Sequence, residues 1–183
     1  MERIEHRTAN QLFHRMIASA HKQGLGEPHM LQRTIIGIDP GETTGFAYYI
    51  PELDKFTLTM MQIPTKDRNE GADLIEDQIK LAKHLGPSVT QRPIIVCEDY
   101  RVYGHKTDQH AWAGLHTPKL IGHIERIAYK LGIPMVFPMA IEAKSWADDP
   151  KLKQWDLYEP GMRHARDACR HVVTRAFYGK DPL

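Results

Sequence analysis

Residues 34–45 read TIIGIDPGETTG, an apolar and largely β-branched run that ends in one carboxylate before a turn rich in glycine and threonine. Val, Ile and Thr favour strands, whereas Asp is depleted in them. Asp39, at the end of a predicted strand over 34–38, therefore needs an explanation beyond packing. A carboxylate on a rigid strand is placed accurately enough to bind a hard cation. The stretch indicates either such a site or an ordinary strand end followed by a turn.

The composition of the 183-residue chain is that of a globular protein, with 42% apolar and 26% charged residues. It has no run of about 18 apolar residues, and its first residues lack the pattern of a secretory signal. Cys97 and Cys169 lack metal-type spacing, so we expect reduced thiols, a cytoplasmic location and no membrane partner. Because the net charge is only +1, any nucleic-acid contact has to come from local groups of charge.

Hydrophobic periodicity predicts five strands and three helices in the main part of the chain. The strands are expected at 34–38, 46–50, 56–63, 93–97 and 134–139, and the helices at 71–85, 117–131 and 160–178. Three meandering strands followed by βαβ units predict an α/β fold with a mixed five-stranded sheet flanked by helices. The first and fourth strands should be parallel neighbours. Residues 140–160 show no clear periodicity.

Residues 1–30 are expected to form an N-terminal helical extension that precedes a main domain over 31–183. Apolar residues between positions 10 and 22 follow helical spacing, and Gly24, Gly26 and Pro28 then break the helix. The extension could pack on the domain, on a second subunit or on DNA. Packing is the favoured interpretation.

Three acidic residues are predicted to meet at one edge of the sheet. Asp39 ends the first strand, Glu98 follows the fourth, and Asp167 lies on the last helix beside its apolar stripe. Neighbouring strands lie about 4.8 Å apart, so Asp39 and Glu98 should converge, and His164 and His171 share the helical side of Asp167. Such an oxygen-rich cluster suits Mg²⁺ or Mn²⁺. Two such ions about 4 Å apart can hydrolyse a phosphodiester. Taken singly, each acid is more often a solvated charge.

The chemistry-bearing segments resemble a known family. They are Gly37-Ile38-Asp39-Pro40-Gly41 with Thr44-Gly45, Cys97-Glu98-Asp99-Tyr100, and His164-Ala165-Arg166-Asp167-Ala168. Over about residues 33–178, these motifs and the order of elements resemble the RuvC-type Holliday junction resolvases of the RNase H-like superfamily. The resemblance implies a homodimeric, Mg²⁺-dependent endonuclease, in which Mn²⁺ can substitute. Such enzymes nick opposed strands of a four-way DNA junction symmetrically during recombination and repair.

The resemblance also implies roles for individual residues. Asp39, Glu98, His164 and Asp167 match the family's metal-site positions. Lys144 resembles the family's lysine, although Ala143 rather than valine precedes it. It would contact the scissile phosphate or its water, and an ordinary solvated lysine is the alternative.

The segment after Glu98 departs from the family pattern. Where the family carries an aromatic residue that inserts at the junction centre, this chain has Arg101, flanked by Tyr100 and Tyr103. We expect this segment to bind DNA, with cationic groups on phosphates and a ring stacked on an unpaired base. The predicted DNA-binding residues are Tyr100, Arg101, Tyr103, His105 and Lys106.

Two further features concern the origin of the protein and its contacts with DNA. The turn after Asp39 is shorter than in cellular resolvases, and compact, divergent forms are typical of bacteriophages, which would place the protein in the cytoplasm of a bacterial host. Arg163, Arg166 and Arg170 are expected to form a separate stripe of the last helix that is turned away from the acids. They would reach phosphates there or face solvent.

Other functions fit parts of the sequence. The Asp-x-Gly-x-Thr pattern that starts at Asp39 also resembles the phosphate-binding hairpin of the sugar kinase, Hsp70 and actin superfamily. That class closes two domains around ATP, and it leaves His164 and Asp167 unexplained. A junction-binding module without turnover is a second alternative, against which the retained acids argue. Among nucleases, cleavage of RNA–DNA hybrids or of a broader set of branched DNAs stays open.

Overall fold

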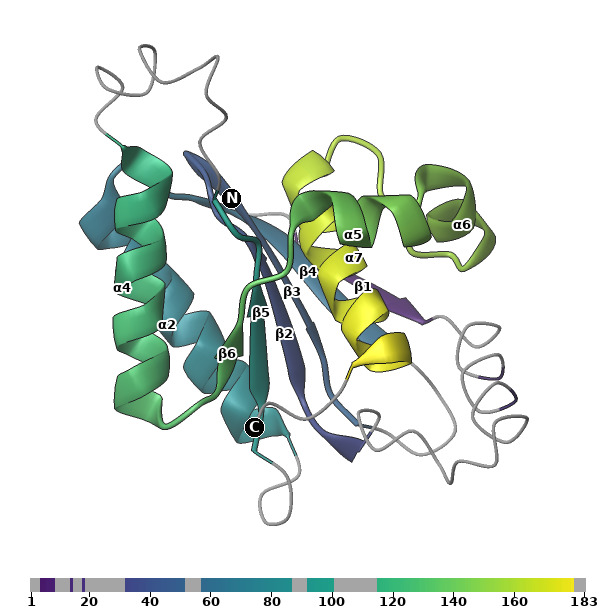
Figure 1. Cartoon of the computed structure of the whole chain (residues 1–183), viewed down its shortest axis with the longest axis horizontal. Helices are drawn as coiled ribbons and strands as arrows, with labels where there is room; N and C mark the ends of the chain where they lie inside the picture. Colours follow the sequence, from purple (N-terminus) through teal and green to yellow (C-terminus); the bar gives the residue numbers. More distant parts are fainter. Residues whose placement is uncertain are drawn as a thin grey trace.

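The chain is built around one mixed β-sheet with helices on both faces (Figure 1). The computed structural model describes residues 4–8, 14, 18, 32–51, 57–86, 92–100 and 115–179. The strands are β1 (Ile4–Thr8), β2 (Ile35–Asp39), β3 (Thr43–Tyr49), β4 (Thr57–Pro64), β5 (Ile94–Cys97) and β6 (Met135–Val136). The helices are α2 (Arg68–Leu85), α4 (His116–Leu131), α5 (Ala140–Trp146), α6 (Asp149–Gln154) and α7 (Arg163–Tyr178). The expected α/β class is confirmed.

Strand β2 lies in the interior of the sheet, whose strand order is β1-β4-β3-β2-β5-β6. It is antiparallel to β3, with Asp39 opposite Gly45, and parallel to β5, with Ile38 opposite Cys97. The Glu98 backbone N–H donates to the Ile38 carbonyl at 2.9 Å, which extends the ladder beyond β5. The predicted parallel pairing is confirmed, and it places the carboxyl ends of β2 and β5 at the same edge.

The sheet has six strands in the described part of the chain, rather than the five that were predicted. The additional strand, β1, pairs antiparallel with β4, so that Ile4 lies opposite Met61. The β1 sequence IEHRT carries a single aliphatic side chain, so its sequence has no apolar alternation. An unpaired β4 would expose a row of backbone donors and acceptors. Pairing with that edge is therefore what makes these residues a strand.

Most of the predicted N-terminal helix over 10–22 lies outside the described residues. His14 and Ala18 are described, and both have helical backbone. Since β1 belongs to the sheet, part of the predicted extension over 1–30 is joined to the main fold. The division between this extension and a domain over 31–183 otherwise stays a prediction.

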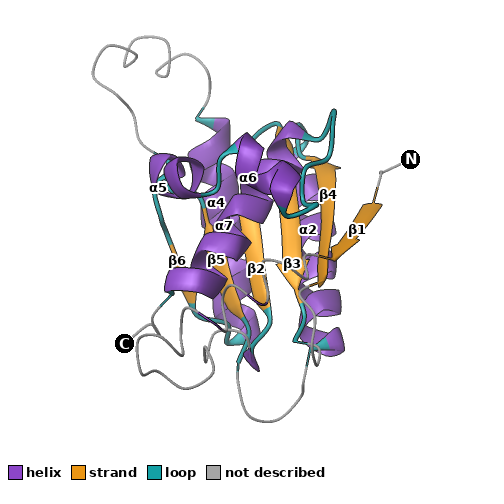
Figure 2. Cartoon of the chain, turned by 90° about the vertical axis from the view of Figure 1, so that its right-hand side faces the viewer, coloured by secondary structure: helices purple, strands orange, loops and turns teal. Residues whose placement is uncertain are grey.

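Each face of the sheet is covered by a different set of helices. In Figure 2, α7 lies in front of the strands, whereas α2 and α4 lie behind them. Successive side chains of β2 point to opposite faces, so Ile35 packs in the core under α7 and Ile36 in the core under α2 and α4. No helix in the parts of the chain that the structure describes is both long and apolar enough to cross a membrane.

The region between β5 and α7 differs from prediction. The strand predicted over 134–139 is reduced to Met135–Val136, since Pro134 and Pro138 flank it and proline cannot donate to a ladder. Residues 140–160, which show no periodicity, contain the short helices α5 and α6. Asp148 caps α6 by accepting from the Lys151 backbone N–H at 3.0 Å. Helices of one or two turns are too short for a hydrophobic repeat to show.

Candidate active site

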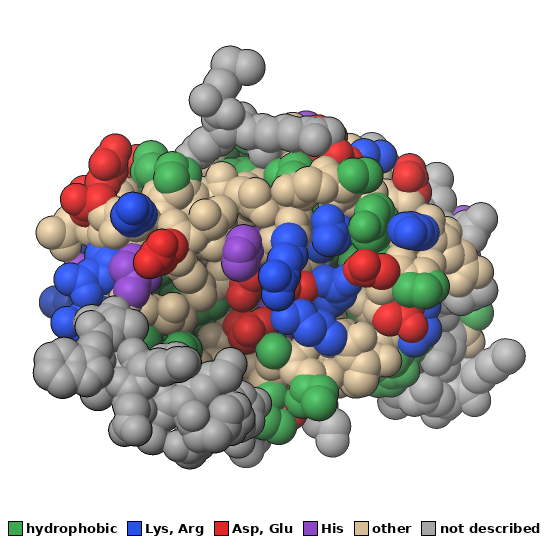
Figure 3. Space-filling view, turned by 90° about the horizontal axis from the view of Figure 1, so that it is seen from above, with side chains coloured by type: hydrophobic (Ala, Val, Ile, Leu, Met, Phe, Trp, Pro, Cys, Tyr) green, Lys and Arg blue, Asp and Glu red, His purple; other side chains and the backbone are tan. Residues whose placement is uncertain are grey.

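The predicted acids meet at the edge where β2 and β5 end. Asp39 ends β2, Glu98 follows β5, and Asp167 lies one helical turn after His164 near the start of α7. Glu98 and Asp167 each lie near enough to Asp39 to raise the pKa of its carboxyl group. Viewed onto this edge, acidic side chains lie near the centre of the face, with histidine and a group of Lys and Arg side chains beside them (Figure 3).

Two glycines allow α7 to lie directly on the strands. A Cβ atom at Gly45 would lie 1.8 Å from the His164 carbonyl oxygen, and one at Gly37 would lie 2.3 Å from the Ala168 carbonyl oxygen. Any side chain at Gly45 would therefore push the first turn of α7 off the sheet. The glycines around Asp39 serve this close approach of helix and sheet, which brings His164 within reach of Asp39.

Asp39 and His164 form the first acid–base pair of the site. The His164 Nδ1–H donates to Asp39 Oδ2 at 2.8 Å, and Asp39 is only 8% exposed. Burial raises the pKa of Asp39 against the opposing effect of the His164 hydrogen bond, and the nearby carboxylates of Glu98 and Asp167 raise it further. The hydrogen bond to Asp39 is the main reason that the pKa of His164 is raised. The pair therefore holds a proton between Nδ1 and Oδ2 more firmly than either group would alone.

Glu98 has a histidine partner that was not assigned to the site from sequence. His171 Nε2 donates to Glu98 Oε2 at 3.1 Å, and His171 is only 2% exposed. Its position on the same helical side as Asp167 was the available signal, but a buried histidine on an apolar helix is more often a packing residue. Its Nδ1 is buried without a hydrogen-bond partner among the described residues.

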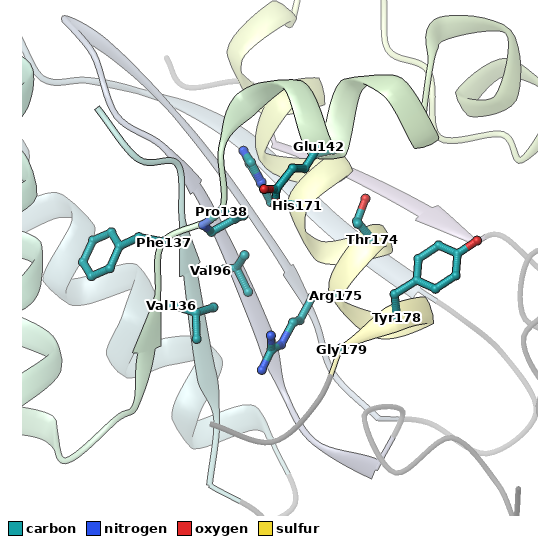
Figure 4. Close-up of a pocket in the computed structure, with 11 residues that line it drawn as sticks. Val96, Val136, Phe137, Pro138, Glu142, His171, Thr174, Arg175, Tyr178 and Gly179 are labelled. Atoms are coloured by element: carbon teal, nitrogen blue, oxygen red, sulfur yellow. The ribbon is translucent and has the colours of Figure 1, made fainter. Parts of the chain in front are cut away.

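A cavity of about 340 Å³ lies on the other side of His171, between α7 and the β5–β6 edge (Figure 4). Its walls include Val96, Val136, Thr174 and Tyr178 together with the charged residues Glu142 and Arg175. Of the described residues that line it, none is a predicted metal ligand. His171 therefore separates this cavity from the acidic cluster.

Asp167 is held by two cations. Its Oδ1 accepts from Arg170 one turn further along α7, and its Oδ2 lies 3.1 Å from Lys144 Nζ on α5. Arg170 also donates to the Ala147 carbonyl at 2.8 Å and pairs with Asp149. The prediction that Arg170 is turned away from the acids is wrong, because residues three apart on a helix are neighbours and α5 closes over this side of α7.

A second cavity, of about 360 Å³, opens beside Asp167. It is lined by four cationic and three acidic residues: Lys144, Arg163, Arg166, Arg170, Asp148, Asp149 and Asp167. Arg163 and Arg166 therefore lie next to the acidic cluster, and not on a separate face as expected. Arg166 Nη1 donates to the Glu159 carbonyl at 2.6 Å, and its guanidinium lies 4.5 Å from the centre of the Tyr158 ring.

Threonine hydroxyls hold the turn that follows β2. Thr44 Oγ1 and Thr65 Oγ1 are 2.9 Å apart, and Thr65 also donates to the Gly41 carbonyl. His116 Nε2 donates to the Thr65 carbonyl at 2.7 Å. This chain of hydrogen bonds joins the start of α4 to the turn beside the acidic cluster.

The predicted DNA-binding segment is described only at its start. Tyr100 is half-buried and follows Asp99, whose backbone N–H donates to the Pro138 carbonyl at 2.9 Å. The other predicted contacts lie outside the described residues and stay predictions: Arg101, Tyr103, His105 and Lys106.

The donor set fits a hard divalent cation in its chemistry. Asp39, Glu98 and Asp167 offer carboxylate oxygens and His164 offers an imidazole, which are the ligands that Mg²⁺ and Mn²⁺ accept. The raised pKa of Asp39, to which the other two carboxylates contribute, marks a place where a cation would relieve repulsion. Each ligand nevertheless has a protein partner, and no group of three His, Cys, Asp or Glu side chains in the described ranges is arranged ready to hold a metal. These partners would have to be exchanged when an ion binds.

Comparisons with known proteins bear on the fold. No protein-family model and no curated protein matches the chain. A solved structure of T. thermophilus RuvC in complex with Holliday junction substrate matches with a TM-score of 0.59 at 19% identity, covering 80% of this chain and 94% of that one. A Thermus thermophilus RuvC structure matches with a TM-score of 0.58 at 18% identity, covering 79% and 94%. The chain therefore has the RuvC-like, RNase H-like fold that its motifs predicted.

Proposed function

We propose that this protein is a divalent-metal-dependent endonuclease that resolves four-way DNA junctions by paired, symmetric nicks. One observation carries the proposal: a RuvC-like sheet brings Asp39, Glu98, Asp167 and His164 together where β2 and β5 end. One of the similar structures is a RuvC in complex with a Holliday junction substrate. The proposal thus combines the chemistry of the residues with the geometry of the fold.

Asp39, Glu98, Asp167 and His164 are the residues that would hold Mg²⁺ or Mn²⁺. A pair of bound cations supplies an activated water and stabilises the leaving oxygen of the phosphodiester. His164 holds a proton at Nδ1 against Asp39 Oδ2, so loss of that proton frees both groups as ligands. His171 fixes the orientation of Glu98 from behind, as outer-shell partners of metal ligands commonly do.

Local positive charge beside the acids favours a nucleic-acid substrate. The net charge is only +1, yet Lys144, Arg163 and Arg166 all line the cavity next to Asp167. We propose that these three side chains bind phosphates on either side of the scissile bond, where phosphate contacts set position rather than sequence. The segment from Tyr100 to Lys106 is proposed to supply the contacts that select a junction.

A four-way junction presents two equivalent strands, so symmetric cleavage calls for a two-fold symmetric enzyme. We therefore propose a homodimer that carries one active site per subunit. The compact, divergent sequence favours a bacteriophage resolvase that works on recombining DNA in the host cytoplasm. An active species that stays monomeric in light scattering would contradict the dimer.

The test is gel-resolved cleavage of a labelled four-way junction with Mg²⁺ or Mn²⁺, beside linear duplex, flap and RNA–DNA hybrid substrates. The Asp39→Asn variant is the inactive control, and Asp73→Asn, which changes an exposed acid on α2, is the matched one. We expect paired nicks at symmetric positions on the junction alone. Cleavage of flaps or hybrids instead would keep the metal site and change the substrate. Absence of metal-dependent cleavage of every substrate would overturn the proposal and favour a binding module.

A further inference from the structure

Both carboxylate oxygens of Asp167 are occupied by cations from the chain itself. Arg170 of α7 contacts Oδ1, and Lys144 of α5 lies 3.1 Å from Oδ2. Asp167 is buried, and its carboxylate lies near that of Asp39. A buried charge without a partner is strongly destabilising. The two cations therefore neutralise Asp167 in the protein without ligands.

The two cations are held very differently. Arg170 is 8% exposed in its side chain, and it bonds to Asp167, Asp149 and the Ala147 carbonyl at the same time. Lys144 is 41% exposed, and among the described residues its ion-pair partner is Asp167 Oδ2. An arginine held by three acceptors stays in place. A half-exposed lysine with a single partner can leave that partner with only a small loss of free energy.

We propose that Lys144 is an exchangeable internal counter-cation: it occupies Asp167 Oδ2 until a divalent ion takes that oxygen. The inference rests on the proposed function, because it concerns the same acidic cluster. Arg170 is a positioning residue that keeps Oδ1 fixed while Oδ2 changes partner. Binding of the ion and release of Lys144 are therefore one event.

The cavity beside Asp167 gives the released ammonium a destination. Lys144 lines this cavity together with Arg163 and Arg166, so an ammonium group that leaves Oδ2 adds a positive charge to a wall that also carries the Asp148 and Asp149 carboxylates. That wall is where we place the phosphates of the DNA strand. Lys144 thus couples binding of the divalent ion to binding of the phosphate. The bound ion also offsets the negative charge of the acidic cluster, which then repels DNA least.

The proposal predicts effects of opposite sign on metal binding and on cleavage. Mn²⁺ affinity is measured by titration calorimetry on the full chain without DNA, and single-turnover cleavage of the junction is measured at saturating Mn²⁺. We expect Lys144→Met to bind Mn²⁺ up to about fivefold more tightly, which is the size of a half-exposed ion pair, and to cleave more slowly. Lys144→Arg, which keeps the charge, should bind Mn²⁺ as the wild type does. Lys119→Met, which removes an exposed lysine of α4, should change neither quantity.

Equal or weaker Mn²⁺ binding by Lys144→Met would overturn the proposal, because a merely structural lysine lowers affinity and cleavage together. Lys144→Gln repeats the test if the Met variant fails to fold. Wild-type protein that binds Mn²⁺ and cleaves junctions, beside a Met variant without tighter binding, refutes this inference alone. Wild-type protein that neither binds Mn²⁺ nor cleaves refutes the proposed function and this inference with it.

Discussion

The site has a strand side and a helix side that are built on different principles. The strand side consists of Asp39 and Glu98, whose backbones are held by the ladder between β2 and β5. The helix side consists of His164, Asp167, Arg170 and His171 on α7 together with Lys144 on α5. Its histidine, arginine and lysine side chains are the partners described above for the three acids. The two strand-side acids are thus mounted on a rigid frame, whereas the side chains that compensate their charge come from helices packed on the sheet. Removing an acid and removing its compensation should have different consequences.

Loss of the strand-side acid should give the largest change in activity. We expect Asp39→Asn to lower junction cleavage more than about 1,000-fold without lowering the free energy of unfolding. Burial disfavours the ionised form of Asp39, as its raised pKa shows, and the amide oxygen of Asn can still accept from His164. Cleavage assays measure the loss of activity, and urea unfolding monitored by circular dichroism measures the free energy of unfolding.

The matched control is the exposed acid at Asp73 on α2, which should leave both quantities unchanged when it is replaced by Asn. Near-wild-type turnover of Asp39→Asn would remove Asp39 from the chemistry. A large loss of stability would show that the two sides of the site do not differ as described.

Loss of helix-side compensation should act on stability instead. We expect Arg170→Met to lower the free energy of unfolding by about 3 kcal/mol, because Asp167 is left buried with one fewer partner. Urea unfolding measures the change. Lys80→Met, which removes an exposed i,i+4 ion pair with Glu76 on α2, should cause no measurable change. Equal effects of the two variants would show that Arg170 does not hold Asp167 in solution.

The contact between the two sides can be broken at Gly45. We expect Gly45→Ala to destabilise the fold by about 2 kcal/mol or more, since the new Cβ would lie 1.8 Å from the His164 carbonyl oxygen. Cleavage should fall as well, because His164 moves away from Asp39. Gly122→Ala on α4 is the control: nothing lies within 4 Å of its Cβ, and alanine favours a helix by up to about 1 kcal/mol. A Gly45→Ala variant as stable as wild type would mean that α7 does not rest directly on β3.

His171 sharpens the comparison, because it supports a strand-side acid from the helix side. We expect His171→Leu to lower cleavage about 10- to 100-fold, as losses of outer-shell partners do. His171→Gln, which keeps an N–H donor for Glu98, should recover part of the activity. Single-turnover rates at saturating Mn²⁺ check this order. Equal rates for the two variants would make His171 a packing residue.

The smallest effect is expected at Cys169, in the core beneath α7. Burial raises the pKa of its thiol to about 12 from an ordinary 9.0. Between these values the unfolded chain loses the thiol proton and the folded chain keeps it, so stability falls as pH rises from 9 towards 12. We expect Cys169→Ala to lose less stability than wild type between pH 8 and pH 10. Equal losses in the two proteins, measured by urea unfolding, would contradict the burial of this thiol.

Local patterns predicted the strand side well. The β-branched runs before Asp39 and Glu98 are short, apolar and bounded by turns, and parallel pairing then places their ends together. The strong apolar periodicity of the last helix also predicted that His164 and Asp167 lie on the same side of it. The roles of Arg101, Tyr103, His105 and Lys106 stay predictions, since they lie outside the described residues.

The helix side was predicted only in part. Lys144 lies beside Asp167, and its contact with the scissile phosphate or its water stays a prediction. The short helices α5 and α6 were not predicted. Arg170 was assigned to the wrong side of α7, and His171 received no role. Strand β1 was also missed, because an edge pairing depends on the partner strand more than on its own sequence.

Periodicity and motif spacing in the chain determined β2 to β5, the three long helices α2, α4 and α7, the parallel pairing of β2 with β5 and the identity of the acidic cluster. These features depend on contacts between residues that are near in sequence or related by regular geometry. The partners of each acid depend on how α5 and α7 pack against the sheet, at glycine contacts such as Gly45 with His164. Such long-range packing is decided only when distant segments are brought together, so the tertiary structure alone assigned the counter-charges of the site.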